Sequence, residues 1–219
     1  TLCYGGGMPR PRVYEPDQVL DAVESLTVAS GPAAVTIRAI SAAVGVSNGA
    51  LYHTFGSRAG MIGRAWLRAG RRFLDLQNAL VDQALSATGP QAAIAAVAAA
   101  ADAPVVFAER YPNSSKVLWA VSAEELIASD PPEGVAAELS DLHRLLIGLM
   151  IRLAVNLWDR KDAAAVDTIT TCIVDLPTAI VLRRNGVGDP TARQQLRAAV
   201  RAVLDTGPPP VKKRRTSWD

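Results

Sequence analysis

A cluster of polar and basic side chains in residues 36–58 has the chemistry of nucleic-acid binding. It combines hydroxyl, amide, phenol, imidazole and guanidinium groups: Thr36, Arg38, Ser47, Asn48, Tyr52, His53 and Arg58. Hydroxyl and cationic groups bind phosphate oxygens, and an asparagine amide matches the edge of adenine in the major groove. The sequence has no recognisable pairing of a nucleophile with a base, no carboxylate pair and no phosphate-binding glycine loop, so it does not predict an enzyme.

The net charge of +2 is unevenly distributed along the chain. Residues 36–74 contain six arginines and no acidic residue, whereas acidic residues outnumber basic ones between residues 91 and 207. Such a chain can place one basic end against phosphate while the other end stays in solution. Four of the arginines are expected on the solvated face of a helix: Arg64, Arg68, Arg71 and Arg72.

Two short helices joined by a turn must position these groups. Thr36 and Ser47 each precede a helical segment and can cap it, and Gly45 permits a tight turn between the two. The apolar residues are spaced to form a small core: Ile40, Val44, Val46, Leu51 and Phe55. The residues left facing outward are Asn48, Gly49, Tyr52 and His53. This pattern predicts a helix-turn-helix whose second helix enters the major groove.

Several positions have a specific reason to lie against DNA. Tyr52 and His53 are expected on phosphate or a base edge, and Gly49, which costs roughly 1 kcal/mol inside a helix, lets the backbone approach. Arg58 lies in the first turn of the next helix, where a cation opposes the helix dipole unless a phosphate binds there. Thr36 and Arg38 are expected to hold another phosphate.

The remainder of the chain has helical periodicity, and no segment has a strand pattern. Residues 135–157 form the clearest apolar stripe and are expected as a core helix. The last two helices are expected at about residues 163–184, with a kink caused by Pro177, and at residues 190–206, capped by Asp189. The breaks between helices predict an all-α fold of about nine helices.

Composition and spacing exclude other classes. No apolar stretch free of charges approaches the roughly 18 to 20 residues of a membrane span, and the first residues lack a secretory pattern, so we expect a cytoplasmic protein. Cys3 and Cys172 do not suggest a disulfide framework, and Cys172 is expected as a buried filler. His53 and His143 are far apart and have no metal-binding spacing around them, so neither a metal nor a cofactor is expected.

The segment TIRAISAAVGVSNGALYHTFGSRAGMI, residues 36–62, resembles the DNA-binding signature of the TetR/AcrR transcriptional regulators. The similarity lies in the Thr cap, the Ala-x-x-x-Gly-Val-Ser turn, the Gly-x-Leu-Tyr-x-x-Phe recognition helix and the Ser-Arg start of the next helix. Asn48 stands where the family usually has Lys, and Thr54 where it often has a second aromatic residue, so the operator sequence is not expected to transfer. Beyond about residue 80 the resemblance is one of layout.

The resemblance implies a TetR-like fold with a helix-turn-helix DNA-binding domain at residues 15–62 and a helical ligand-binding and dimerisation domain at 63–207. Composition predicts a disordered arm at residues 1–14 before them and a disordered basic tail at 208–219 after them. A homodimer formed through the last two helices would place two recognition helices about 34 Å apart over a palindrome of double-stranded DNA.

The expected function is a repressor that a small apolar or amphiphilic effector releases from its operator. The candidates for lining an effector pocket are Phe107, Tyr111, Trp119, His143, Met150 and Trp158. Two alternatives remain open from sequence: an activator of the same fold, and a helical ligand carrier or enzyme whose helix-turn-helix is vestigial.

Overall fold

The computed structural model describes residues 15–87, 89–183 and 186–211. The expected arm at residues 1–14, Cys3 and the basic residues of the tail lie outside the described residues. Within the described part the chain is helical and has no strand, which confirms the all-α expectation. The α-helices are α1 (Pro16–Ser30), α2 (Ile37–Val44), α3 (Asn48–Phe55), α4 (Arg58–Leu85), α5 (Pro90–Arg110), α6 (Pro112–Ala120), α7 (Ala123–Ala128), α8 (Glu133–Trp158), α9 (Ala163–Thr170) and α10 (Pro190–Thr206).

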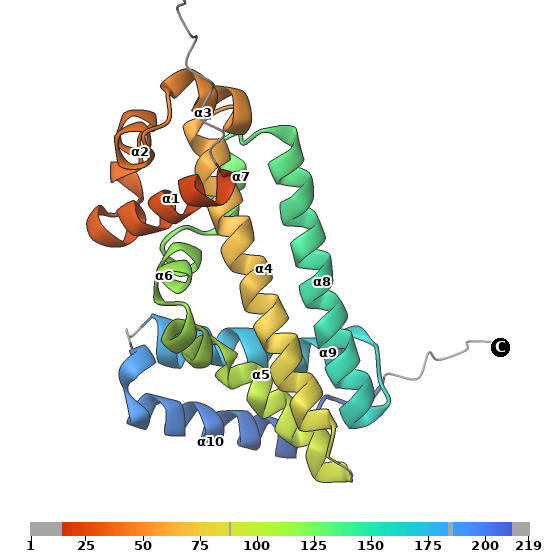
Figure 1. Cartoon of the computed structure of the whole chain (residues 1–219). Coiled ribbons are helices and arrows are strands. Elements are labelled where there is room, and N and C mark those ends of the chain that lie inside the picture. The colour runs from red at the N-terminus through yellow and green to blue at the C-terminus, as the bar shows by residue number, and fades with distance from the viewer. Residues whose placement is uncertain (1–14, 88, 184–185, 212–219) are drawn as a thin grey trace, which may run out of the picture.

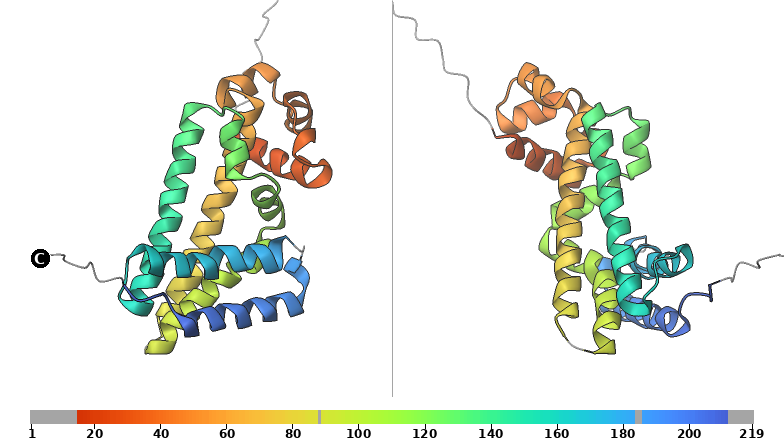
Figure 2. Two further views of the ribbon diagram at one scale, coloured as in Figure 1. Left: turned by 180° about the vertical axis from the view of Figure 1, so that it is seen from behind. Right: turned by 90° about the vertical axis from the view of Figure 1, so that its right-hand side faces the viewer.

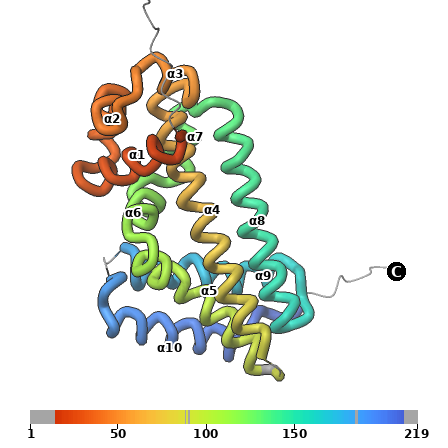
Figure 3. The backbone as a smooth tube through the Cα atoms, viewed as in Figure 1, coloured from red at the N-terminus to blue at the C-terminus, as the bar shows by residue number. Residues whose placement is uncertain are grey.

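The longest helices connect two ends of the molecule. Helices α1, α2 and α3 gather at one end, and α4 runs from there to the opposite end with α8 beside it (Figures 1 and 3). Helices α5, α9 and α10 cross the far end of α4 (Figure 2). Helix α6 lies between these two groups and contacts α1, α4 and α5. The fold therefore places one short helix between the two ends.

Side-chain caps decide where several helices begin. Ser57 Oγ accepts a hydrogen bond from the Gly60 amide at the start of α4. Residues 112–128 form two helices, α6 and α7. Ser122 and Glu125 form a reciprocal capping box, which starts a new helix at Ala123. This local signal is present in the sequence and accounts for the break between α6 and α7.

Two prolines are accommodated inside helical segments. Pro177 is expected to kink its helix, and the structure places π-helical turns on both sides of it, at η2 (Thr171–Asp175) and η3 (Thr178–Leu182). The wider turns keep residues 163–182 in one continuous helical segment. Pro104 stands inside α5 and has no N–H to donate to the carbonyl of Ala100 four residues earlier. The side chain of Gln77 donates to that carbonyl instead, at 2.9 Å.

Glycines allow α4 and α8 to approach closely. A Cβ added at Gly63 would lie 2.6 Å from Val135 Cγ1, and one added at Gly70 would lie 2.5 Å from Leu142 Cδ2. Real Cβ atoms are not found that close to a neighbour, so these two positions exclude larger residues in the present packing. The two long helices are therefore held side by side along the upper half of α4 (Figure 2).

Two apolar cores lie along α4. The first joins the helix-turn-helix end to α7 and the beginning of α8; its members include Val19, Val23, Ile40, Leu51, Phe55, Met61, Leu126, Val135 and Leu139. Ile40, Leu51 and Phe55 are buried, and Val44 and Val46 pack against them, so the small core expected from their spacing is confirmed. The second core joins the end of α4 to α5, α8, α10 and residues 163–182.

Two helical segments are long and apolar enough to cross a membrane by length and composition: Gln91–Arg110 and Ala163–Leu182. Core helices of soluble proteins have the same properties, and 56% of the first segment is buried inside the fold. In the second segment 33% is buried, and most of its other residues are half-buried; its larger apolar side chains pack on the second core. Cys172 in this segment is a buried free thiol, and burial raises the pKa of that thiol to about 12, which confirms its expected place as a filler.

Asp102 connects α5 to α10. Its carboxylate accepts hydrogen bonds from Arg193 at 2.7 and 2.5 Å and from Arg197 at 3.1 Å. Burial raises the pKa of the Asp102 carboxyl, but the hydrogen bonds from the two arginines outweigh it, and the pKa lies below its ordinary value. The resulting stabilisation is present above the ordinary pKa of aspartate and is lost as the pH falls through the lowered value.

We expect Asp102→Asn to lower the free energy of unfolding at neutral pH by about 1–3 kcal/mol, because it removes charge-assisted bonds at a mostly buried carboxylate. Urea unfolding at several pH values should show the difference from wild type shrinking below about pH 4. The control Asp205→Asn removes an exposed pair with Arg201 and should cost less than about 0.5 kcal/mol. Equal losses of unfolding free energy in the two variants would contradict the stabilising role given to the Asp102 carboxylate.

Candidate functional site

The helix-turn-helix is built as its local sequence indicates. Thr36 Oγ1 accepts a hydrogen bond from the Ala39 amide at 3.1 Å, and Ser47 Oγ accepts one from the Ala50 amide at 3.3 Å. Gly45 ends α2 in the left-handed conformation with φ of +69°, which glycine adopts without a steric penalty. The turn therefore fixes α3 against α2 through backbone geometry and caps.

Helix α3 presents a polar face to solvent. Tyr52 is 53% exposed, and Asn48 and His53 are also exposed, while Leu51 and Phe55 on the opposite face are buried. A Cβ built on Gly49 would meet no atom within 4 Å, so packing inside the chain does not require glycine there. A close approach by another molecule is a physical reason for glycine at an open position on this face.

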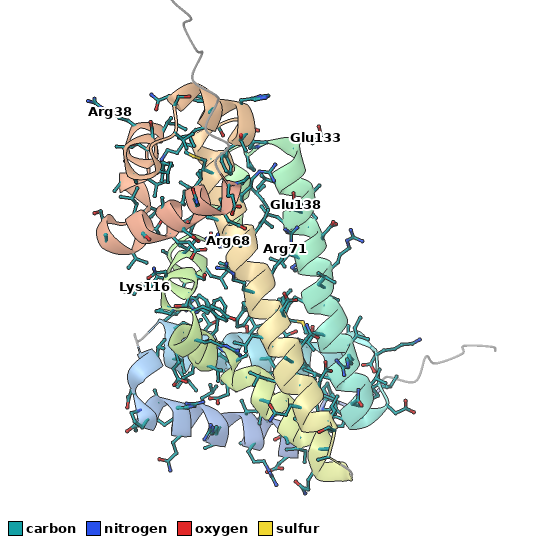
Figure 4. The ribbon with its side chains drawn as sticks, viewed as in Figure 1. Arg38, Arg68, Arg71, Lys116, Glu133 and Glu138 are labelled. Atoms are coloured by element: carbon teal, nitrogen blue, oxygen red, sulfur yellow. The ribbon has the colours of Figure 1, made fainter. Side chains whose placement is uncertain are left out.

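Arg38 extends the same surface onto α2. Figure 4 shows its side chain projecting away from the rest of the chain, and it forms no ion pair with the described residues. The hydroxyls of Thr36 and Ser47 act as helix caps, and as acceptors there they keep a proton that can be donated outward. The residues expected to contact DNA on α2, α3 and their caps thus lie on one exposed end of the molecule.

Arg58 has partners inside the chain. Its Nε donates to the carbonyl of Val35, and a terminal nitrogen donates to the carbonyl of Pro32 at 2.5 Å. Pro32 begins the short 3-10 turn η1 (Pro32–Ala34) between α1 and α2. Arg58 therefore fastens the start of α4 to the connection that leads into α2. This bonding accounts for a cation at the start of a helix without a bound phosphate.

The four arginines that follow in α4 are not a free solvated row, and the sequence-based expectation is wrong for Arg68. Its side chain is only 13% exposed and bonds to Asp17, Asp21 and Glu24 on α1. The other three also have acidic partners: Arg64 and Arg71 pair with Glu138 on α8, and Arg72 lies near Glu24. Figure 4 shows Arg71 and Glu138 between the two long helices. The basic character of residues 36–74 is therefore largely compensated by distant carboxylates.

Glu24, Arg68 and Ser114 form a junction between α1, α4 and α6. Glu24 is 4% exposed; it accepts from Arg68 at 2.7 Å through one oxygen and from Ser114 Oγ at 2.9 Å through the other. Burial lowers the pKa of the Arg68 guanidinium, but its bonds to Glu24 and Asp21 outweigh this and raise that pKa above its ordinary value. The Arg68 guanidinium therefore keeps its charge, and the junction joins α6 to the helix-turn-helix end.

Two adjoining cavities lie on the other side of α6. The larger is about 340 Å³ and reaches α5 and residues 173–182; the smaller is about 270 Å³ and is bounded by α4, α6, α7 and α8. Both are lined by Trp66, Phe73, Leu118 and Leu146. Together they form a mostly apolar space beside the helix that carries Ser114, and the larger has the dimensions of a small-molecule pocket.

The structure divides the six residues expected to line a ligand pocket. Trp119 lines the larger cavity and His143 the smaller. Phe107 stacks behind Trp119 with ring centroids 5.7 Å apart, and Tyr111 lies against Phe107 at 5.4 Å, so these two support the wall.

The remaining two candidates lie elsewhere. Met150 is buried in the second core, where its sulfur accepts from Thr170, and Trp158 lies at the end of α8 near Gly207. Sequence reasoning did not include Trp66, Phe73 or Gln77, which occur in α4. Gln77 stands among the apolar positions of that helix, and a polar residue at such a position is the signal that could have identified this part of the cavity wall. No group of His, Cys, Asp and Glu among the described residues could hold a metal ion.

Comparison with known proteins identifies the class. Residues 19–65 match the profile of "Bacterial regulatory proteins, tetR family". The fold resembles that of a TetR-family transcriptional regulator from Streptomyces coelicolor, with 19% identity, TM-score 0.56 and coverage of 88% of this chain and 98% of that one. No curated protein sequence matches.

Two further solved structures are similar over most of their length. Ketosteroid transcriptional regulator KstR2 of Mycobacterium tuberculosis has 19% identity and TM-score 0.57, with coverage of 91% and 98%. Fatty acid degradation regulator FadR from Bacillus halodurans has 14% identity and TM-score 0.60, with coverage of 87% and 98%. The match of residues 19–65 supports a DNA-binding regulator, and the solved structures show that the fold is of the same kind. Residues 19–65 are thus a TetR-family DNA-binding domain by their sequence, and the fold of the described chain is TetR-like.

We expect Arg58→Ala to lower the free energy of unfolding by about 1–2 kcal/mol, because the carbonyls of Val35 and Pro32 lose their donor. Denaturant unfolding measures the change. Arg38→Ala is the matched control, since it removes an exposed arginine nearby, and should change stability by less than about 0.5 kcal/mol. If the Arg58 variant is as stable as wild type, the arginine does not fasten α4 to η1.

Proposed function

We propose that this protein is a dimeric transcriptional repressor that acts in the cytoplasm, binds a palindrome in double-stranded DNA and releases it when a small, mostly apolar effector enters the cavities beside α6. The helix-turn-helix domain at residues 15–62 reads DNA, and residues 63–207 bind the effector and the second subunit. The contact residues are those of the exposed face and its caps: Thr36, Arg38, Ser47, Asn48, Gly49, Tyr52 and His53.

Arg58 is left out of the proposed contact set because its guanidinium is already used by two backbone carbonyls. Affinity then depends on Arg38 and on uncharged hydrogen-bonding groups of α3. Asn48 is suited to adenine, so the operator is expected to contain A·T pairs where the start of α3 meets the groove. Tyr52 offers a phenol to a phosphate from a position that is half exposed in the free protein.

The proposed dimer face is the apolar stripe of α8, defined as Leu145, Gly148, Ile151 and Val155. Leu145 is 63% exposed and Val155 40%, and a Cβ at Gly148 would meet no atom within 4 Å. The spacing puts all four on one side of the helix, and the open glycine permits a second copy of α8 to approach. Helix α9, which begins the partly exposed segment 163–182, adjoins α8.

The outward residues of α10 are alanine and polar residues, including Gln194, Gln195 and Arg201. This surface offers less apolar area than α8. The sequence predicts a dimer interface formed by the last two helices. We therefore propose an interface that includes residues 163–182, as predicted, and α8 in place of α10.

The observation that carries effector control is the position of α6. One face of this helix supplies Leu118 and Trp119 to the cavity wall, and its beginning supplies Ser114 to the buried junction with Glu24 on α1. A molecule that fits the cavity only when α6 is displaced must also displace α1 or break that junction. Effector binding therefore favours a different spacing of the two recognition helices, by its differential affinity for the two arrangements.

Selection from a random-sequence duplex library should recover a palindrome whose affinity falls as salt is added, with a modest slope because Arg38 is the arginine of the proposed contact face. We expect Tyr52→Ala to weaken binding at least about tenfold in fluorescence anisotropy, because a contact at the protein–DNA surface is lost. Gln194→Ala on the far side of the molecule is the control and should bind as wild type does. A folded protein that selects no DNA sequence, or that binds DNA without salt dependence, would refute the proposal. A promoter reporter then distinguishes repression from activation.

The coupling between effector binding and DNA release is tested by fluorescence anisotropy with any small molecule that a thermal-shift screen shows to bind. Ser114→Ala removes the hydroxyl between α6 and Glu24, so it should bind that molecule normally but lose most of the effector-induced release of DNA. Ser140→Ala, an exposed serine of α8, is the control. Full release in the Ser114 variant would mean that the signal takes another route.

Size-exclusion chromatography with light scattering tests the dimer face. Leu145→Glu and Ile151→Glu place a charge on the apolar stripe of α8 and should shift the protein to monomers, because a like charge meets its copy across a two-fold interface. Ala198→Glu, on the exposed side of α10, should leave the dimer intact. The reverse result would place the interface on α10.

A further inference from the structure

Among the described residues that line the larger cavity, none carries a charge that could balance an ion. Its walls are apolar and aromatic, and the polar side chains in them are neutral: Gln77, Trp119, Ser122 and Thr178, with Trp66. The smaller cavity adds His143 and otherwise apolar residues. Transfer of an ionised group from water into such a site is strongly unfavourable without an opposite charge.

Gln77 is held in place by a consequence of the proline in α5. Pro104 cannot donate to the carbonyl of Ala100, and Gln77 Nε2 occupies that position at 2.9 Å. This bond fixes the orientation of the amide, because a flipped amide would set its oxygen against the carbonyl. The residue is 1% exposed, and its Oε1 has no hydrogen-bonding partner among the described residues. A fixed acceptor is therefore left at the cavity wall.

Trp119 leaves a fixed donor in the same wall. Its ring packs edge-on against Phe73 at 5.7 Å and stacks on Phe107 at 5.7 Å, so it has little freedom to turn. Its Nε1 is buried and has no partner within the described part of the chain. Trp66, which lines the same cavity, differs because its Nε1 donates to the Val121 carbonyl at 2.9 Å. Buried polar groups are almost always hydrogen-bonded, so two exceptions in one cavity point to a ligand.

We infer that the effector is an uncharged, mostly apolar molecule with a hydroxyl or carboxamide group that donates to Gln77 Oε1 and accepts from Trp119 Nε1. This inference rests on the proposed function, since it names the class of molecule that occupies the cavities beside α6. Carboxylates and amines are disfavoured, because the described residues in the walls of the larger cavity supply neither a cation nor an anion. An ether or alkane of the same size leaves Gln77 Oε1 unpaired and binds less tightly.

The test uses four simple probes of similar size with the full-length protein: 1-decanol, its isomer methyl nonyl ether, decanoate and decylammonium. Calorimetric titration should show 1-decanol binding at least roughly tenfold more tightly than the ether, which accepts but cannot donate. The two ions should bind more weakly still. In spectra of ¹⁵N-labelled protein, the indole N–H signal that disappears in Trp119→Phe should shift when 1-decanol is added.

Matched variants isolate the two polar groups. Pro104→Ala restores a backbone donor for Ala100, so the double variant Gln77→Leu/Pro104→Ala removes the Gln77 acceptor without leaving that carbonyl unpaired. Compared with Pro104→Ala alone, it should bind 1-decanol and the ether equally. Trp119→Phe keeps the ring packing and should weaken the binding of both probes, because each oxygen accepts from the indole N–H, while the preference for 1-decanol remains. Circular dichroism and thermal unfolding confirm that each variant is folded.

Three results would overturn the inference: equal affinity for 1-decanol and the ether, tighter binding of either ion, or no binding of any probe. DNA binding is measured separately on the same protein. If DNA binding and its release by another class of molecule persist, the proposed function stands and the ligand class is wrong. If 1-decanol binds with the expected selectivity but no DNA sequence is selected, the ligand class stands and the proposed function is wrong.

Discussion

The buried carboxylate of Glu24 is the interaction on which the arrangement of the molecule depends. One oxygen accepts from Arg68 on α4 and the other from Ser114 on α6, while Glu24 itself belongs to α1. A charge at 4% exposure is tolerated only when it is paired and hydrogen-bonded, so the three helices must keep this relation in the folded state. The helix-turn-helix is therefore attached to the body through a polar contact with a specific geometry, in addition to the apolar first core.

That contact makes α6 a connecting element between the two ends of the fold. Its beginning joins the Glu24 junction, and its later residues Leu118 and Trp119 form part of the cavity wall. Packed helices exchange between discrete arrangements more readily than they deform, so a change in the cavity can reach α1 as a change in packing. The long helix α4 takes part in both cores and provides the fixed reference for such a movement.

Charge counted along the sequence and charge available in the fold differ here. Residues 36–74 carry six arginines, yet Arg64, Arg68, Arg71 and Arg72 lie near carboxylates of α1 and α8. Arg58 is exposed in part but is bonded to backbone carbonyls, and Arg38 is the exposed arginine of α2 and α3. The proposed recognition of DNA by this surface therefore depends on the hydrogen-bonding groups of α3 to a greater degree than the local charge indicates.

The sequence by itself determined the features that depend on residues a few positions apart. Caps at Thr36 and Ser47, the turn at Gly45 and the buried face of α3 all follow from interactions within one or two helical turns. Tertiary structure alone decided the partners of Arg68, the bond from Gln77 to Ala100 and the uncovered stripe of α8. Periodicity shows which face of a helix is apolar, but the neighbour of each side chain depends on how distant segments pack.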